Sequence, residues 1–175
     1  VLERSEDFGG AVRWGVPAYR LPVETIRKDI DAIAAMGVEF KAGVELGKDV
    51  TIDDLVGQGF DAVILALGLP DSRGLPIPNN DHPDVLMALP FLRAARNGES
   101  LIRKGAEVIV IGSGNVAMDV ARTAVRFGAG KVRIVCLEKR HEMPASPWEV
   151  EEAIEEGVAV EHCGWGPTAV LVGDD

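Results

Sequence analysis

Residues 108–117 read Val-Ile-Val-Ile-Gly-Ser-Gly-Asn-Val-Ala, and this stretch decides the fold. Its four apolar residues are typical of a strand that is buried in a parallel sheet, and a helix-forming run over 115–127 follows them. The pattern G-x-G-x-x-A places Gly112 in a tight turn, Gly114 where the backbone approaches a pyrophosphate, and Ala117 where the helix packs on the strand. The free N–H groups and partial positive charge of a helix start attract phosphate. The stretch therefore predicts a dinucleotide-binding turn.

Strands and helices alternate on both sides of this turn. The expected strands cover 107–111, 132–137 and 158–160, and the expected helices cover 115–127 and 149–156. A βαβαβ order is half of a doubly wound, Rossmann-like α/β fold with a parallel sheet. We therefore predict an NAD(P)-binding domain over residues 105–175, incomplete at its carboxyl-terminal end.

An acidic residue, Glu138, stands where the second of these strands ends. A carboxylate there accepts hydrogen bonds from the adenosine ribose hydroxyls and repels a 2′-phosphate, which favours NAD over NADP. The neighbouring Lys139 and Arg140 point the other way, because either could reach a phosphate. The pattern leaves two alternatives open: glycines that serve only helix–strand packing, and a methyltransferase, whose cofactor loop and strand-end acid are similar.

The first hundred residues show a less regular succession of elements. We expect a helix after Pro22, with a Gly37 cap, and a short helix opened by a Thr51–Asp54 capping box. We also expect the end of a strand at 1–3 and two further strands at 38–40 and 61–68. A surface linker is expected at 70–83, followed by a helix at 85–96 in which Pro90 marks a kink or a late start. The 61–68 run is almost wholly apolar, which predicts burial on both faces.

Composition excludes several classes of protein. The chain has 175 residues, of which 47% are hydrophobic and 26% are charged, and its net charge is −10. That charge repels nucleic acids and anionic membranes, and no run approaches the roughly 20 apolar residues of a membrane span. Without a signal peptide, a cytoplasmic protein is expected. The two cysteines, Cys136 and Cys163, lie outside any Cys-x-x-Cys pattern, so we expect neither a disulfide framework nor a redox dithiol. The three histidines share no ligand spacing, so we expect no metal site.

Several motifs resemble one family. The runs Gly-Ser-Gly-Asn-Val-Ala-Met-Asp-Val-Ala-Arg-Thr-Ala (112–124) and Glu-Met-Pro-Ala (142–145) resemble the glutamate synthase small-subunit-like family, as does the opening, with Val-Leu-Glu (1–3), Gly9-Gly10 and Gly-Val-Pro-Ala-Tyr-Arg-Leu-Pro (15–22). Members are FAD- and iron–sulfur-linked NAD(P)H oxidoreductases, related to the flavin half of dihydropyrimidine dehydrogenase. The resemblance covers nearly the whole chain. It implies a partial FAD-binding domain over 1–104, with a linker at about 70–104, followed by the NAD(P)-binding domain.

The resemblance also implies roles for individual residues. Glu3 would hold the FAD ribose, Arg20 would reach that cofactor, and Leu46 would lie near its adenine. In the NAD half, family members that use NADP often have two arginines where this chain has Leu137 and Glu138, so NAD is again favoured. The full set of implied cofactor-binding residues is Glu3, Gly9, Gly10, Arg20, Leu46, Gly68, Gly112, Ser113, Gly114, Asn115, Val116, Glu138 and Arg140.

The function that follows is electron transfer. Hydride would pass between NADH and FAD with no acid–base side chain, and electrons would continue to iron–sulfur centres outside this segment or to an electron-accepting subunit. The first strand and glycine turn of the FAD domain are expected before residue 1, so we expect the segment alone to be inactive. Leu67 stands where the family usually has threonine, and this departure points to an alternative, a non-catalytic nucleotide-binding or docking module.

Overall fold

The computed structural model describes residues 1–173. The chain divides into two compact units, Val1–Pro70 and Asp71–Asp175, and each is described by itself. The division falls where the predicted linker begins. The predicted domain boundary at residue 105 stays a prediction.

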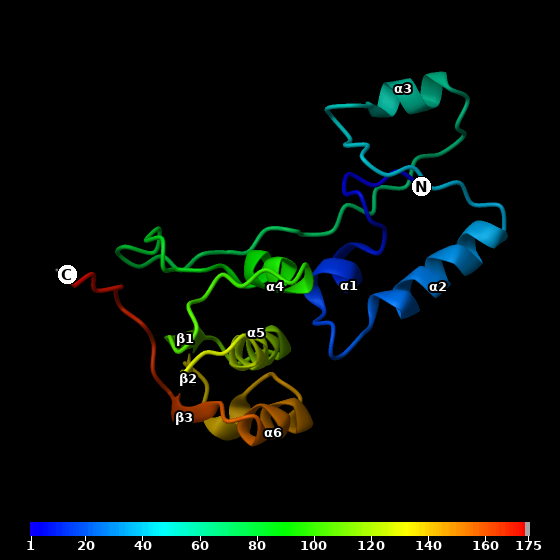
Figure 1. Ribbon diagram of the computed structural model, residues 1–175. Helices are drawn as coiled ribbons and strands as arrows, with labels where there is room; N and C mark the ends of the chain where they lie inside the picture. Colours follow the sequence, from blue (N-terminus) through cyan, green and yellow to red (C-terminus); the bar gives the residue numbers. More distant parts are fainter. Residues whose placement is uncertain (174–175) are drawn as a thin grey trace. The chain divides into compact units, whose positions relative to one another are not determined.

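The second unit is the predicted βαβαβ arrangement (Figure 1). Its parallel sheet has the order β1-β2-β3, and helix α5 links β1 to β2. The α/β fold class is therefore confirmed. The elements are α4 (Ala88–Arg96), β1 (Glu107–Ile111), α5 (Asn115–Arg126), β2 (Lys131–Cys136), the 3-10 turn η1 (Arg140–Glu142), α6 (Pro147–Glu155) and β3 (Ala159–Cys163).

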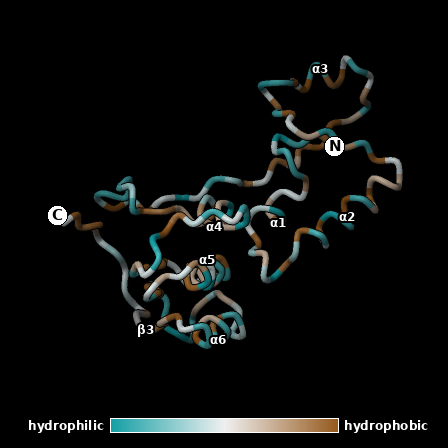
Figure 2. The backbone as a smooth tube through the Cα atoms, viewed as in Figure 1, coloured by the Kyte–Doolittle hydropathy of each residue, from teal (hydrophilic) through white to brown (hydrophobic). Residues whose placement is uncertain are grey.

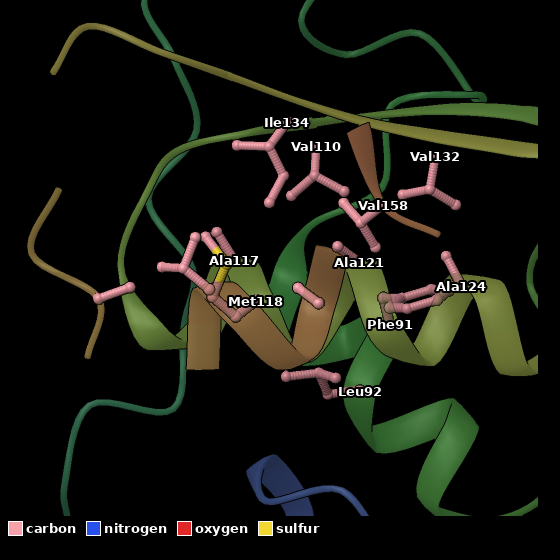
Figure 3. Packing of buried hydrophobic residues seen from close by; sticks show 13 residues of the cluster. Phe91, Leu92, Val110, Ala117, Met118, Ala121, Ala124, Val132, Ile134 and Val158 are labelled. Carbon is pink, nitrogen blue, oxygen red and sulfur yellow. The ribbon is translucent and has the colours of Figure 1, made fainter. Parts of the chain in front are cut away.

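The hydrophobic core lies between the sheet and its helices (Figure 3). Small side chains on one face of α5 let the helix approach the strands closely, so that Met118, fully buried, shares one cluster with Val110 and Ile134. Helix α4 adds Phe91 and Leu92 to this cluster. The helix begins at Ala88 rather than at residue 85, which confirms a late start. Proline is tolerated within a first turn because the N–H groups there have no helical acceptor.

Ion pairs join α5 to α6. Arg122 is only 7% exposed; its Nη2 lies 2.7 Å from Oε1 of Glu156, and its Nη1 pairs with Glu152. Arg126 Nη2 lies 2.7 Å from the same Glu156 oxygen. Burial alone would raise the pKa of Glu156, but the hydrogen bonds and charges of Arg126 and Arg122 outweigh it and hold this pKa below its ordinary value. Two of the carboxylates of α6 and its carboxyl-terminal end, Glu152 and Glu156, therefore hold the helix to α5.

The first unit contains three helices, α1 (Gly10–Gly15), α2 (Val23–Ala35) and α3 (Ile52–Gly57). The predicted helix after Pro22 is confirmed as α2, and Gly37 follows it with a φ of 93°. The predicted capping box is also present: Asp54 N donates to Thr51 Oγ1 at 3.1 Å, and Thr51 N donates to the Asp54 carboxylate at 2.9 Å.

Helix α1 was not predicted. A six-residue helix bounded by glycines has no apolar periodicity to announce it. Gly9, which precedes α1, lies close to α2: a Cβ at this position would be only 3.0 Å from Cγ2 of Ile26. Its φ of 114° also favours glycine.

The strands predicted in this unit are wrong. Residues 61–68 and 38–40 have no strand structure, and the unit's only bridges among described residues are the isolated pairs Leu2–Lys41 and Leu46–Val50. Figure 2 colours the backbone by the hydropathy of each residue. Ile64 is 90% exposed and Leu67 is 68% exposed, so the hydrophobic stretch 61–68 is not buried. A buried strand needs neighbouring strands to take its N–H and C=O groups, and the described residues of the unit supply none.

Candidate functional site

The glycine turn joins β1 to α5 in the predicted way. Gly112 has a φ of 125°, a left-handed conformation that favours glycine. Its N–H donates to the carbonyl of Val135 at 2.9 Å, which fixes the turn to β2. A Cβ at Gly112 would lie 3.9 Å from that of Ala117. The chain's own geometry therefore explains why a glycine stands at this position.

Gly114 differs, because nothing in the described chain requires glycine there. It caps α5 with an ordinary φ of −83° and ψ of 173°, and a Cβ would meet no atom within 4 Å. Within the described residues, no acceptor takes the N–H groups of four successive residues at this junction: Ser113 and Gly114, which precede α5, and Asn115 and Val116, which begin it. Unused amides at a helix N-terminus form an anion-binding site.

The strand-end acid is connected directly to this turn. The hydroxyl of Ser113, a residue only 3% exposed, donates to Oε2 of Glu138 at 2.6 Å. This hydrogen bond, together with one from the Glu138 N–H, lowers the pKa of the Glu138 carboxyl. Glu138 is therefore a carboxylate at neutral pH and lies beside the unused amides. The sequence predicted both residues but not the bond between them.

The segment before α6 supports the turn from its other side. Ala145 N donates to the carbonyl of Ser113 at 3.1 Å, and Ser146 N donates to Oδ1 of Asn115 at 2.8 Å. Sequence reasoning assigned no role to Ala145 or Ser146. The one signal that could have found them is the 142–145 motif, which entered only as a mark of resemblance.

The chain after β3 lies along the end of β2. Trp165 N donates to the carbonyl of Cys136 at 2.8 Å, and Gly164 N donates to that of Glu138 at 3.1 Å. The side chains of Leu137 and Trp165 are 72% and 67% exposed. Apolar surface therefore flanks Glu138 at the carboxyl edge of the sheet, where ligands of open α/β sheets bind.

The remaining predicted residues are separated from this turn in the sequence. Arg140 begins η1 and is exposed. The six residues predicted to contact FAD all lie in the first unit. The Glu3 carboxylate accepts a hydrogen bond from Ser5 N at 2.8 Å, and Gly9 and Gly10 lie at the start of α1. The Arg20 guanidinium lies 5.9 Å from the centre of the Tyr19 ring. Leu46 lines a hollow with Thr51 and Ile52, and Gly68 ends the stretch 61–68, which has no strand structure.

Two further findings concern the described residues as a whole. Among the side chains that the structure describes, which leave out those at positions 161 and 162, no cluster of three or more His, Cys, Asp or Glu could hold a metal ion. Over the same residues, no helix is both long enough and apolar enough to cross a bilayer.

Relatives support the predicted resemblance. The chain is 37% identical over 168 residues to the small chain of glutamate synthase (NADPH) of Escherichia coli (strain K12), covering 90% of this chain and 35% of the relative. It is 37% identical over 170 residues to the NAD-dependent dihydropyrimidine dehydrogenase subunit PreT of Escherichia coli O157:H7, covering 97% and 40%. The curated relatives are much longer, and the chain spans 15% to 40% of their length.

A solved structure supports the fold as well. FprA from Mycobacterium tuberculosis, in a His57Gln mutant form, matches with a TM-score of 0.73 and 27% identity over 89% of this chain and 40% of that chain. The family model described as pyridine nucleotide-disulphide oxidoreductase matches residues 5–163. The chain, with its glycine turn between a parallel strand and a helix, therefore belongs to the pyridine nucleotide-disulphide oxidoreductase family.

Proposed function

We propose that the second unit binds NADH through the glycine turn. The observation that carries the proposal is the group of unused amides at 113–116, next to the ionised Glu138. The amides would hold the pyrophosphate, and Glu138 would accept hydrogen bonds from the adenosine ribose. Gly114 supports this assignment, because a Cβ there would meet no atom of the described chain, which leaves space for a pyrophosphate to approach the backbone. Family membership argues against the methyltransferase alternative.

We assign NAD rather than NADP as the preferred nucleotide. The lowered pKa of Glu138 keeps a negative charge where the 2′-phosphate of NADP would lie, and burying a phosphate against a carboxylate is unfavourable. Lys139 and Arg140 are exposed at the start of η1, and no hydrogen bond within the described chain joins them to the Glu138 carboxylate. The relatives' names include both NADPH and NAD, so the choice rests on this carboxylate.

For the longer protein we propose hydride exchange between NADH and FAD, with electrons passed to iron–sulfur centres or to a partner subunit. Family membership supports the oxidoreductase class. The nicotinamide supplies the hydride, and this chain's contribution is to hold the nucleotide in one position, since no acid–base group is needed. No FAD step is assigned to the residues of the first unit. The predicted contacts of Glu3, Gly9, Gly10, Arg20, Leu46 and Gly68 stay proposals.

Calorimetry with NADH and NADPH tests the nucleotide assignment. We expect saturable NADH binding that is stronger than NADPH binding. Glu138→Arg should reverse this preference, because it replaces the repelling charge with a phosphate partner. The matched control is Glu151→Arg, which makes the same charge change at an exposed position of α6 and should leave the preference unaltered. Absence of saturable NADH binding, or equal affinity for the two nucleotides in the unaltered chain, would refute the proposal.

The non-catalytic alternative rests on Leu67 and has a separate test. The longer protein should be yellow after reconstitution with FAD and should be bleached by NADH. A protein that binds NADH but stays colourless after reconstitution would favour a nucleotide-binding or docking module.

A further inference from the structure

The two cysteines, which are 27 positions apart in sequence, are direct neighbours in the sheet. Cys136 ends β2 and Cys163 ends β3, and the two residues are register partners in this parallel pair. Paired residues on adjacent parallel strands point their side chains to the same face. Neighbouring strands lie about 4.8 Å apart, within the roughly 4.4–6.8 Å between Cα atoms that a disulfide requires.

The thiols also influence each other. Burial raises the pKa of the Cys136 thiol, and a hydrogen bond with the Cys163 thiol raises it further. Cys136 is 2% exposed, whereas Cys163 is partly exposed. Cys163 is thus the more exposed of the two residues, and Cys136 is sheltered beside it.

We propose that Cys136 and Cys163 form a vicinal dithiol that closes to a cross-strand disulfide when it meets a small disulfide oxidant. In the first step, the Cys163 thiolate attacks one sulfur of the oxidant, forms a mixed disulfide and releases one thiolate. In the second step, the Cys136 thiolate attacks the Cys163 sulfur and releases the second thiolate. The two cysteine protons pass to the released thiolates, so one oxidant is reduced to two thiols for each disulfide formed.

The cysteine pair lies next to the proposed nucleotide site. The Cys136 thiol lies 3.4 Å from the carbonyl oxygen of Glu138, and the Cys136 carbonyl accepts from Trp165. A covalent link here would join the ends of β2 and β3 at the edge that carries Glu138. The inference does not depend on nucleotide binding, and its test requires no nucleotide.

Incubation of the chain with glutathione disulfide provides the test. Mass spectrometry without reduction should show a product that has lost two hydrogen atoms, and thiol titration of the denatured product should find no free thiol. Cys136→Ser and Cys163→Ser should each stop short of this product. Closure should accelerate as the pH rises, because the attacking species at Cys136 is the thiolate.

A two-thiol control separates proximity from simple reactivity. The double variant Cys163→Ser/Ser100→Cys keeps two thiols but places one of them at an exposed position of the segment before β1. We expect the natural pair to close at least about tenfold faster, because its thiols are held together. Equal rates, two separately glutathionylated cysteines, or a disulfide between two chains would overturn the proposal.

Discussion

Gly114→Ala separates a glycine that a ligand requires from one that the fold requires. The backbone at Gly114 has a φ of −83°, which alanine adopts freely. A Cβ there would have no neighbour within 4 Å. The new methyl group therefore causes no clash in the described chain, and it projects into the space beside the unused amides.

The expected change in stability can be worked out from two opposing terms. Alanine is a poorer N-cap than glycine, which costs roughly 0.5–1 kcal/mol. Alanine also restricts the unfolded chain, which stabilises the folded state by about 0.4–1 kcal/mol. The free energy of unfolding should therefore change by less than about 0.5 kcal/mol, a shift of about 2 °C or less in melting temperature.

NADH affinity should respond very differently from stability. A methyl group between the backbone and the pyrophosphate lengthens the amide–phosphate contacts, and we expect affinity to fall at least about tenfold, or about 1.4 kcal/mol. Calorimetry and thermal melts of the same samples measure both quantities. Gly57→Ala is the matched control, since Gly57 also has open space around its Cβ and lies in the first unit. Gly114→Ala protein that melts normally and binds NADH as tightly as the unaltered chain would refute the assigned pyrophosphate site.

Two further predictions concern the stability of the second unit. Arg122→Ala should lower the free energy of unfolding by about 2–3 kcal/mol at pH 7, because it removes a buried cation and leaves the Glu156 carboxylate with Arg126 as its remaining arginine partner. Urea unfolding measures the loss, with exposed Arg103→Ala as the control. The deficit should shrink in acid: the folded pKa of Glu156 lies below its ordinary value of 4.5, so its contribution is present above about pH 4.5 and disappears as the pH falls through the folded pKa. A deficit that stays constant down to acid unfolding would contradict this reasoning. Gly130→Ala should cost about 1–3 kcal/mol, because its Cβ would lie 2.5 Å from the carbonyl oxygen of Gly105, and a melting temperature equal to that of Gly57→Ala would count against it.

The second unit could be predicted from its sequence because local signals and tertiary structure agree there. The run ending at Ile111 is apolar enough for a buried strand, and the structure places β1 at Glu107–Ile111 as expected. Helix α5 begins at Asn115, directly after the glycine turn. When propensity, periodicity and turn chemistry all favour the same element, its position can be predicted to within a residue or two.

The first unit could not be predicted in the same way, because the wrong predictions there concern which strands pair with each other and not the strand propensity of single segments. Residues 61–68 have the composition of a strand, but a strand exists only where other strands accept its hydrogen bonds. Composition contains no information about such partners. The same limitation hid the register of Cys136 with Cys163 and the bond from Ser113 to Glu138, since all of these depend on distant residues meeting at one sheet edge.

The apolar stretch that has no strand structure also has a colloidal consequence. Within residues 61–68, Ile64 and Leu67 are 90% and 68% exposed, and β-prone segments with free backbone groups can associate from one molecule to the next. At neutral pH the charge of −10 keeps molecules apart. Near the isoelectric point, about 4.8, that repulsion disappears while the exposed apolar stretch remains. Mildly acidic buffers should therefore cause the chain to aggregate, measured as turbidity, before they unfold it.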